Sequence, residues 1–278
     1  MAASAFALVT GASAGIGAAF ARELAARGHA LVLTARRADR LDALAAELRA
    51  RHGVAVHCIP CDLADADAPA RLAAEIARLG VVVDVLINNA GYGVTGTFLA
   101  RPWRTHADFI QVMMTAPTEL CHRLLPAMLE RGHGRIVNVA SLAGLLPAPA
   151  GHTLYAASKA YLIRFSQALA LENRRRGVHV CALCPGFTYS EFHDVNGARA
   201  RVARVPGWLW ADAPAVARDA LEAVERGEVV RIVGGVNRAI ARLFRLLPSR
   251  VALGLIDRRG KDFRVTDEPA DGERRDGA

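Results

Sequence analysis

The segment Thr10-Gly11-Ala12-Ser13-Ala14-Gly15-Ile16-Gly17 follows a short apolar run, Ala5 to Val9, and precedes a stretch with helical spacing. In a turn between a strand and a helix, Gly11 permits the tight bend, Gly15 lets the backbone approach a pyrophosphate, and Gly17 lets the helix pack close to the sheet. The amino end of that helix would then face the phosphate charge. Glycines also serve ordinary turns, but their place directly after the first expected strand predicts a dinucleotide-binding unit.

The rest of the chain continues the alternation of apolar runs and helical spacing. Six further apolar runs are expected as strands, at 30–35, 54–59, 81–87, 135–140, 178–183 and 229–233. Helical spacing separates them, and one long helix is expected over 105–131. Continuous apolar strands that alternate with helices are typical of a parallel sheet covered on both faces. We therefore predict a Rossmann-like, doubly wound α/β fold, with a seven-stranded parallel sheet and helices on both faces.

The composition fits one domain with a large core, because 53% of the 278 residues are apolar and the mean hydropathy is +0.20. It excludes a mostly disordered chain, and the scattered prolines and glycines exclude a collagen-like one. No linker or repeat interrupts the pattern, so residues 1–260 are expected to form a single NAD(P)-binding domain. Residues 261–278 are polar and rich in charge, and we expect a flexible tail there.

The basic balance of the chain bears on its partners. The net charge of +8 comes from 33 arginines and two lysines against 27 acidic residues. A basic chain can bind an anionic cofactor, a membrane surface or nucleic acid, but no basic run with interleaved aromatics supports nucleic acid. No uncharged apolar stretch reaches about 18 residues, so no membrane-spanning segment is expected.

The five cysteines indicate the compartment. An odd number of cysteines and the absence of a basic leader favour a reducing cytoplasm. Cys58-x-x-Cys61 and Cys181-x-x-Cys184 have the spacing of zinc ligands, but both pairs lie in or beside expected strands. Residues three apart on a strand point to opposite faces. Buried thiols are therefore expected, and no metal site is predicted.

The end of the second expected strand decides between two cofactors. A carboxylate there would accept a hydrogen bond from the ribose 2′-hydroxyl of NAD, whereas this chain has Thr34 and Ala35 followed by Arg36 and Arg37. Arginine favours a 2′-phosphate, so NADP(H) is preferred, with NAD(H) and a merely solvated arginine as the alternatives. Asp62-Leu63, after the third strand, can meet the adenine edge or begin the next helix.

Polar residues at the ends of the fourth and fifth strands indicate a catalytic site. Asn88-Asn89-Ala90-Gly91 stands at the carboxyl edge of the sheet, where ligands bind in this architecture. Tyr155 and Lys159 share one face of a helix, and Ser141 stands just before that helix. An ammonium beside a phenol lowers its pKa, which would make Tyr155 a usable general acid or base. Ser141 would bond the same substrate oxygen, and Lys159 would also hold the nicotinamide ribose.

These motifs, in this order, resemble those of the short-chain dehydrogenase/reductase family over about residues 5 to 235. The matching segments are Thr10 to Gly17, Asp62, Asn88 to Gly91, Ser141, Tyr155-x-x-x-Lys159 and Pro185-Gly186. The resemblance implies hydride transfer between NAD(P)(H) and an alcohol/carbonyl pair, and a homodimer or homotetramer built through the helices after the fourth and fifth strands. The expected cofactor-binding residues are Gly11, Ser13, Gly15, Ile16, Gly17, Arg36, Arg37, Asp62, Leu63, Asn89, Ala90, Gly91, Tyr155, Lys159, Pro185, Gly186 and Thr188.

One position departs from the family pattern. The family usually carries a catalytic Asn in the helix after the fourth strand, and registering on Leu125-Pro126 places Met113 there. The Asn helps hold a water that relays protons from the Lys, which a thioether does poorly. We expect backbone carbonyls to hold the water or turnover to be slow. The alternative is a register shift by one or two residues, and Gln111 is the nearest amide.

A long segment, about 187–212, would cover the substrate in the resembled family. Its apolar and aromatic residues are Phe187, Tyr189, Phe192, Val205, Trp208, Leu209 and Trp210. These side chains are suited to contact a hydrophobic substrate, or alternatively they pack the segment against the rest of the domain. His193-Asp194 can touch substrate or face solvent.

We therefore predict an NADP(H)-dependent carbonyl reductase or alcohol dehydrogenase acting on a hydrophobic ketone or secondary alcohol, such as a 3-oxoacyl, steroid or other carbonyl compound. The rival hypothesis is a dinucleotide-binding regulatory or interaction protein with weak turnover.

Residues 236–247 form a candidate amphipathic helix beyond the usual end of the family. Val236, Ile240, Leu243 and Leu247 share one face, and the arginines lie away from it. Such a helix can pack on the body, close over the site, join a subunit interface or lie on an anionic membrane. Packing on the body is the favoured interpretation, and peripheral membrane contact is not favoured.

Overall fold

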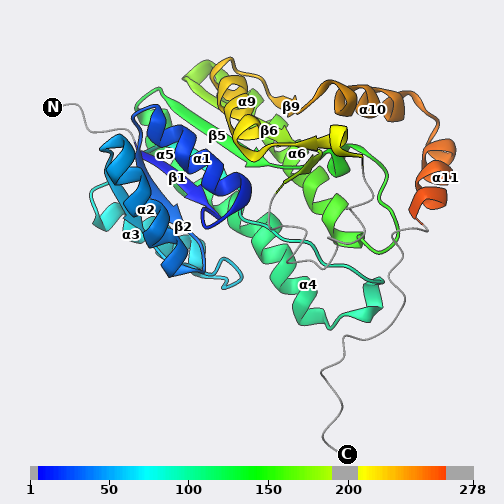
Figure 1. Ribbon diagram of the computed structural model, residues 1–278, viewed down its shortest axis with the longest axis horizontal. Helices are drawn as coiled ribbons and strands as arrows, with labels where there is room; N and C mark the ends of the chain where they lie inside the picture. The colour runs from blue at the N-terminus through cyan, green and yellow to red at the C-terminus, as the bar shows by residue number, and fades with distance from the viewer. Residues whose placement is uncertain (1–5, 190–205, 261–278) are drawn as a thin grey trace, which may run out of the picture.

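The computed structural model describes residues 6–189 and 206–260 of the chain. In these ranges seven parallel strands form one sheet in the order β3-β2-β1-β4-β5-β6-β9 (Figure 1). The strands are β1 (Phe6–Thr10), β2 (Ala30–Thr34), β3 (Val56–Cys58), β4 (Val83–Asn88), β5 (Gly134–Val139), β6 (Val178–Cys184) and β9 (Val230–Ile232). The predicted doubly wound, seven-stranded parallel sheet is confirmed.

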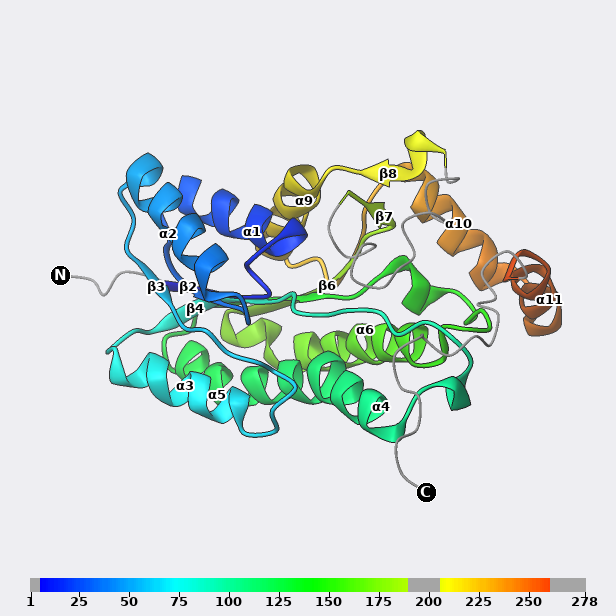
Figure 2. The same cartoon turned by 60° about the horizontal axis from the view of Figure 1, so that its bottom comes forward.

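Helices cover both faces of this sheet, as Figure 2 shows. One face carries α1 (Gly15–Ala26), α2 (Ala38–His52) and α9 (Ala213–Glu225), and the other carries α3 (Ala68–Arg78), α5 (Ala116–Glu130) and α6 (Thr153–Asn173). Successive strand residues point to opposite faces. In β1, Ala7 and Val9 join the first core and Leu8 joins the second. Strands buried on both sides therefore read as continuous apolar runs.

The long helix expected over 105–131 is interrupted. It consists of α4 (Trp103–Ile110), a π-helical turn (Gln111–Thr115) and α5, which has Pro117 in its first turn. Proline has no N–H, and its ring clashes with the carbonyl four residues earlier in a regular α-helix. Widening the preceding turn relieves that clash, so Pro117 accounts for the π-helical turn.

The carboxyl-terminal third adds elements to the predicted pattern. A two-stranded parallel sheet pairs β7 (Phe187–Thr188) with β8 (Trp210–Ala211), while residues 190–205 of the expected substrate cover lie outside the described residues. The helix expected over 236–247 is α10 (Gly235–Leu246). A further helix, α11 (Ser249–Gly260), follows it and was not predicted. The expected tail, 261–278, also lies outside the described residues.

The sheet order determines where a ligand can bind. Strand β1 lies between β2 and β4, so the connections leave β1 and β4 in opposite directions along the sheet. This reversal opens a crevice at the carboxyl ends of the strands, which is where open α/β sheets bind their ligands. In the part of the chain that the structure describes, every helix is too short or too polar to cross a membrane.

Candidate active site

The glycine turn forms a cradle without room for side chains. Gly11 and Gly15 have positive φ angles of 65° and 55°, which favour glycine. A Cβ on Gly11 would lie 2.8 Å from the Cα of Ala90, and a Cβ on Gly17 would lie 2.2 Å from the oxygen of Gly11. No side chain caps α1, so its first backbone N–H groups are left for a ligand. The residues present therefore fit the pyrophosphate of a dinucleotide.

A hydrogen-bond network joins this turn to the end of β4. The Thr10 hydroxyl accepts bonds from the backbone N–H groups of Asn89 (2.9 Å) and Ala90 (3.0 Å). The Asn89 side-chain nitrogen donates to the carbonyl oxygens of Thr10 (2.9 Å) and Gly11 (3.2 Å). Asn89 therefore positions the glycine turn, and its amide nitrogen is already occupied.

The predicted arginine pair divides into two environments. Arg37 is half-buried, and its Nη2 and Nε donate to the hydroxyl of Ser13 at 3.0 and 3.3 Å. Arg36 is exposed. The structure thus brings Ser13 of the glycine turn together with a guanidinium from the end of β2. Both groups can bond a phosphate.

A buried polar ladder beneath the site joins Asn88 of the predicted Asn88–Gly91 segment to Asn138 and Ser166, which the sequence analysis did not single out. Asn88 Nδ2 donates to Asn138 Oδ1 at 2.9 Å, Asn138 Nδ2 donates to Ser166 Oγ at 2.9 Å, and Ser166 donates to the carbonyl of Leu162 at 2.7 Å. The ladder joins β4, β5 and α6, which carry the site. Asn138 stands two residues before the end of an apolar run, and this buried amide was the only signal available from sequence.

The predicted catalytic residues come together at the carboxyl end of β5. Ser141 follows β5, and its Oγ accepts from the N–H of Ala143 at 3.1 Å. Lys159 is 5% exposed, and its Nζ donates to the carbonyl of Val139 at 2.7 Å. The same Nζ lies 5.7 Å from the centre of the Tyr155 ring. Tyr155 is half-buried and hydrogen-bonds with Ser141.

The protonation of this cluster differs from the expectation. Burial raises the pKa of Tyr155 to about 12, and the hydrogen bond with Ser141 acts in the opposite direction. Burial lowers the pKa of Lys159 from 10.5 to about 8, with Cys184 acting in the opposite direction. Desolvation disfavours the charged form of each group. The expected lowering of the phenol pKa by Lys159 is therefore not found, because burial raises this pKa, and the phenol of Tyr155 is protonated at pH 7.

Met113 lies in the π-helical turn and is buried. A Cβ on Gly91 would lie 2.9 Å from its sulfur, so the thioether covers the backbone of Gly91. Tyr155 packs against the same apolar cluster. The Gln111 side-chain nitrogen is buried and has no hydrogen-bond partner in the described residues. A backbone carbonyl, that of Val139, bonds the Lys159 ammonium directly.

The remaining predicted cofactor residues take different positions. Asp62 is exposed, and its carboxylate accepts from the N–H of Ala64 at 3.0 Å, so it caps a turn and not α3. Leu63 is buried among apolar side chains of the same cluster as Met113. Asn237 of α10 lies against Gly186, where a Cβ would meet its side-chain nitrogen at 2.5 Å.

Two further residues complete the predicted cofactor set. Thr188 is buried and donates to the carbonyl of Gly186 at 3.3 Å. Pro185 begins the same loop, directly after β6, and its carbonyl accepts from the N–H of Leu142 at 2.9 Å. The loop after β6 is therefore bonded to the segment after Ser141.

The two cysteine pairs lie far apart. Cys58 belongs to β3 and Cys181 to β6, with four strands between them. At about 4.8 Å per strand spacing, the pairs are separated by about 24 Å. All five thiols are free. Within residues 6–189 and 206–260, no three His, Cys, Asp or Glu side chains form a group that could hold a metal ion.

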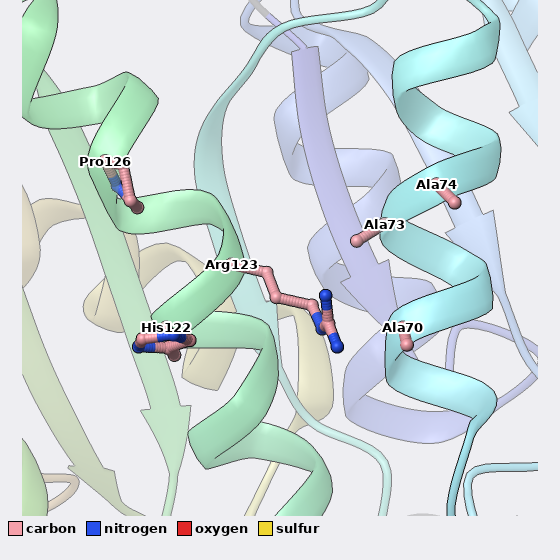
Figure 3. A pocket seen from close by; sticks show the side chains of 6 residues that line it. All are labelled: Ala70, Ala73, Ala74, His122, Arg123 and Pro126. Carbon is pink, nitrogen blue, oxygen red and sulfur yellow. The ribbon is translucent and has the colours of Figure 1, made fainter.

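One hollow on the surface lies outside this site. It has a volume of about 430 Å³ and lies between α3 and α5 (Figure 3). Its lining residues are Ala70, Ala73, Ala74, His122, Arg123 and Pro126. None of them belongs to the predicted site. In Figure 3 the side chain of Arg123 extends from α5 toward the alanines of α3.

A dinucleotide cradle beside a Ser, a Tyr and a Lys on a parallel sheet defines a nicotinamide-dependent oxidoreductase. Comparisons with known proteins agree. A family model described as short chain dehydrogenase matches residues 5–199. Nodulation protein G of Rhizobium sp. (strain N33) is 39% identical over 188 residues, which cover 68% of this chain and 75% of that protein.

Solved structures extend the similarity. A short-chain dehydrogenase from Sphingobium yanoikuyae in complex with NADPH is 33% identical, with a TM-score of 0.76 over 88% of this chain and 97% of that one. A bulky-bulky ketone specific alcohol dehydrogenase from Comamonas testosteroni is 31% identical, with a TM-score of 0.72 over 88% and 95%. The chain belongs to the short-chain dehydrogenase/reductase family and is an oxidoreductase acting on alcohol and carbonyl groups.

Proposed function

We propose that this chain is a single-domain, NADP(H)-dependent reductase of hydrophobic ketones, or a dehydrogenase of the corresponding secondary alcohols. The observation that carries the proposal is the convergence of Ser141, Tyr155 and Lys159 beside the glycine cradle. The nicotinamide supplies or accepts the hydride. The residues of this chain bind and orient the partners and exchange the proton.

Tyr155 is the proposed proton donor to the carbonyl oxygen. A pKa of about 12 keeps the phenol protonated at neutral pH, which suits the direction of reduction. Ser141, hydrogen-bonded to Tyr155, would hold the same oxygen. Lys159, with Nζ 5.7 Å from the Tyr155 ring, would stabilise the phenolate left after proton transfer and bond the nicotinamide ribose.

The preference for NADP(H) rests on Arg37. Its guanidinium, just after the end of β2, bonds the Ser13 hydroxyl of the glycine turn, so two phosphate-binding groups meet where a 2′-phosphate would stand. No carboxylate follows β2 directly, because Ala35 and Arg36 occupy those positions. The NADPH complex of the Sphingobium yanoikuyae relative agrees with this preference.

The proposed hydrophobic substrate rests on aromatic residues after β6. Trp210 packs with Phe187 at 5.5 Å between ring centres and stacks on Tyr189 at 4.7 Å and 22°. Tyr189 is exposed, and Phe187 and Trp210 are half-buried, so these rings can still contact a ligand. The Comamonas testosteroni relative is named for bulky ketones.

The first experiment measures NADPH and NADH oxidation with a panel of bulky ketones, 3-oxoacyl thioesters and steroids. We expect turnover with NADPH that falls about 100-fold or more in Tyr155→Phe, because the general acid is removed. Tyr161→Phe is the matched control, since Tyr161 lies on the same helix and bonds Thr118. Tight cofactor binding without turnover would instead favour the weak-turnover binding protein, with Met113 as the residue to test next.

The cofactor preference has its own test. Arg37→Gln removes the charged partner of the 2′-phosphate and should weaken NADPH binding about tenfold to 100-fold, with NADH binding unchanged. Arg51→Gln, an exposed change on α2, which begins directly after Arg37, is the control. Equal affinity of the Arg37→Gln variant and the wild type for NADPH would contradict the assignment.

We also propose a homodimer or homotetramer in the cytoplasm. Half-buried apolar residues on α5 and α6 support a subunit interface, including Leu124, Leu125, Tyr161, Phe165 and Leu169. The free thiols support a reducing compartment. Light scattering on the purified chain tests the assembly, and a monomer at micromolar concentration would contradict it.

A further inference from the structure

Helix α10 leaves most of its apolar surface exposed. Its buried residues are Asn237 and Ala241, whereas Val236, Leu243 and Leu246 are 43%, 55% and 79% exposed. At about 100° per residue, the three exposed residues lie on the side opposite the two buried ones. The expected packing of the apolar face on the body therefore holds only in part: Ile240 and Leu247 are half-buried, whereas Val236 and Leu243 are exposed. The exposed part of the face, with Leu246, points away from the protein.

The charge of this region is segregated. Residues 235–260 contain six arginines and one aspartate, and so supply five of the net charge of +8. Arg238, Arg242 and Arg245 lie along one flank of the exposed apolar face of α10 and form no ion pair in the described residues. Elsewhere many arginines pair with carboxylates, as Arg22 does with Glu47. Arg238 donates one N–H to the carbonyl of Ile232 at 3.4 Å, and the remaining N–H groups of the three arginines can bond an anionic partner.

Neighbouring elements enlarge the same apolar surface. Trp208 is 69% exposed and lines a small hollow together with Val236 at the start of α10. Helix α11 adds Val251 and Leu255, which are exposed and lie on one side of the helix, about 40° apart, while the exposed Leu253 lies on its other side. Both views place α10 and α11 at one end of the molecule, beyond the sheet (Figures 1 and 2). A flat or broad partner can therefore reach the surface without meeting the body.

We propose that this surface, made of Trp208, α10 and α11, docks onto an anionic phospholipid bilayer. Apolar side chains would enter the boundary between headgroups and acyl chains while the flanking guanidinium groups bond lipid phosphates. A second copy fits less well, because a two-fold contact would place Arg238, Arg242 and Arg245 against their own copies. Nucleic acid would bond the arginines but leave Leu243 and Leu246 in water.

The docking surface adjoins the candidate active site. Asn237 of α10 lies against Gly186, and α10 contacts the short helix Leu142–Leu145 that follows Ser141. If the proposed function holds, the site opens beside the membrane, where apolar ketones accumulate. The docking itself does not depend on that function.

Vesicle flotation of the full-length protein tests the proposal without any activity measurement. Vesicles of phosphatidylcholine alone are compared with vesicles containing phosphatidylglycerol, at low and high salt. We expect binding to the anionic vesicles that falls with salt. The triple variant Arg238→Gln/Arg242→Gln/Arg245→Gln should bind the anionic vesicles about 100-fold less tightly than the wild type. The variant Leu243→Ser/Leu246→Ser should bind them at least about tenfold less tightly.

Matched controls carry the same changes elsewhere. Arg174→Gln/Arg175→Gln/Arg176→Gln lowers the net charge equally, on a turn after α6, and Leu99→Ser/Leu171→Ser replaces leucines that are 90% and 61% exposed. Both controls should bind like the wild type, and circular dichroism should show that every variant is folded.

Three results would overturn the proposal. In the first, the wild type binds neutral and anionic vesicles equally. In the second, the α10 variants and their controls lose binding to the same extent. In the third, the wild-type protein does not bind vesicles. In the last case, loss of a dimer in Leu243→Ser/Leu246→Ser would assign the surface to a second copy, and retention on an RNA column would assign it to nucleic acid.

Discussion

Replacement of Lys159 by methionine should abolish turnover and yet stabilise the fold at neutral pH. The lysine is buried, its Nζ donates to the carbonyl of Val139 at 2.7 Å, and burial lowers its pKa from 10.5 to about 8. In the unfolded chain the same ammonium is fully hydrated. Folding at pH 7 must therefore desolvate a charge, and methionine has a similar length without that charge.

The magnitude follows from the two pKa values. The difference between 10.5 and about 8 corresponds to about 3 kcal/mol of destabilisation at any pH below 8. Loss of the hydrogen bond to Val139 offsets about 1 kcal/mol of the gain. The net increase in the free energy of unfolding is about 2 kcal/mol, or about 5 °C in melting temperature for a chain of this size.

Guanidinium unfolding of wild type and Lys159→Met at pH 7, 8.5 and 10 is the assay. Between pH 8 and 10.5 the unfolded state of the wild type binds more protons than the folded state at this lysine, so its stability rises there relative to the variant. The advantage of the variant should be full at pH 7 and nearly absent by pH 10. The Cys121 thiol titrates in both proteins and cancels in the difference, whereas the Cys184 thiol interacts with Lys159, so both proteins are compared in a Cys184→Ala background.

Either of two results would refute the reasoning. A variant less stable than wild type at pH 7 would mean that the ammonium is stabilised by its contacts. A difference that stays constant from pH 7 to 10 would mean that Lys159 keeps an ordinary pKa in the folded protein.

Three further predictions follow from the site. Gly11→Ala should weaken NADPH binding at least about tenfold, as measured by calorimetry, because a Cβ there would lie 2.8 Å from the Cα of Ala90. Gly53→Ala is the control and should leave NADPH binding unchanged, because Gly53 has a similar φ of 67° but open space around it. Asn88→Ala should lower the free energy of unfolding by about 2 kcal/mol in denaturant, since it leaves the buried Asn138 oxygen without its donor. Alcohol oxidation should rise with pH well above 9, because the high pKa of Tyr155 disfavours the phenolate base; a rate that is flat from pH 7 to 10 would contradict this.

Local sequence signals predicted the order of the elements and much of the site. Each buried strand is a continuous apolar run, and Gly11, Gly15 and Gly17 stand where backbone must turn or approach other backbone. Tyr155 and Lys159 share a helix face because they are four residues apart. These features depend on spacing along the chain, so the sequence alone could reveal them.

Other features depend on contacts between residues far apart in the chain. The bond from Arg37 to Ser13 and the Asn88–Asn138–Ser166 ladder exist only once strands and helices are packed. The pKa values of Tyr155 and Lys159 also depend on how the packed molecule buries these side chains. Spacing predicted a lowered phenol pKa, but burial decided its direction, and burial is a property of the packed molecule.

Helix α10 shows the same division. Its amphipathic pattern predicted a helix and located its apolar face, because a helix turns by about 100° per residue. The pattern did not determine which side of the helix contacts the body. Packing against Gly186 through Asn237 made that choice and turned Leu243 and Leu246 toward solvent. A periodic sequence defines the faces of a helix, and only tertiary contacts decide which face is buried.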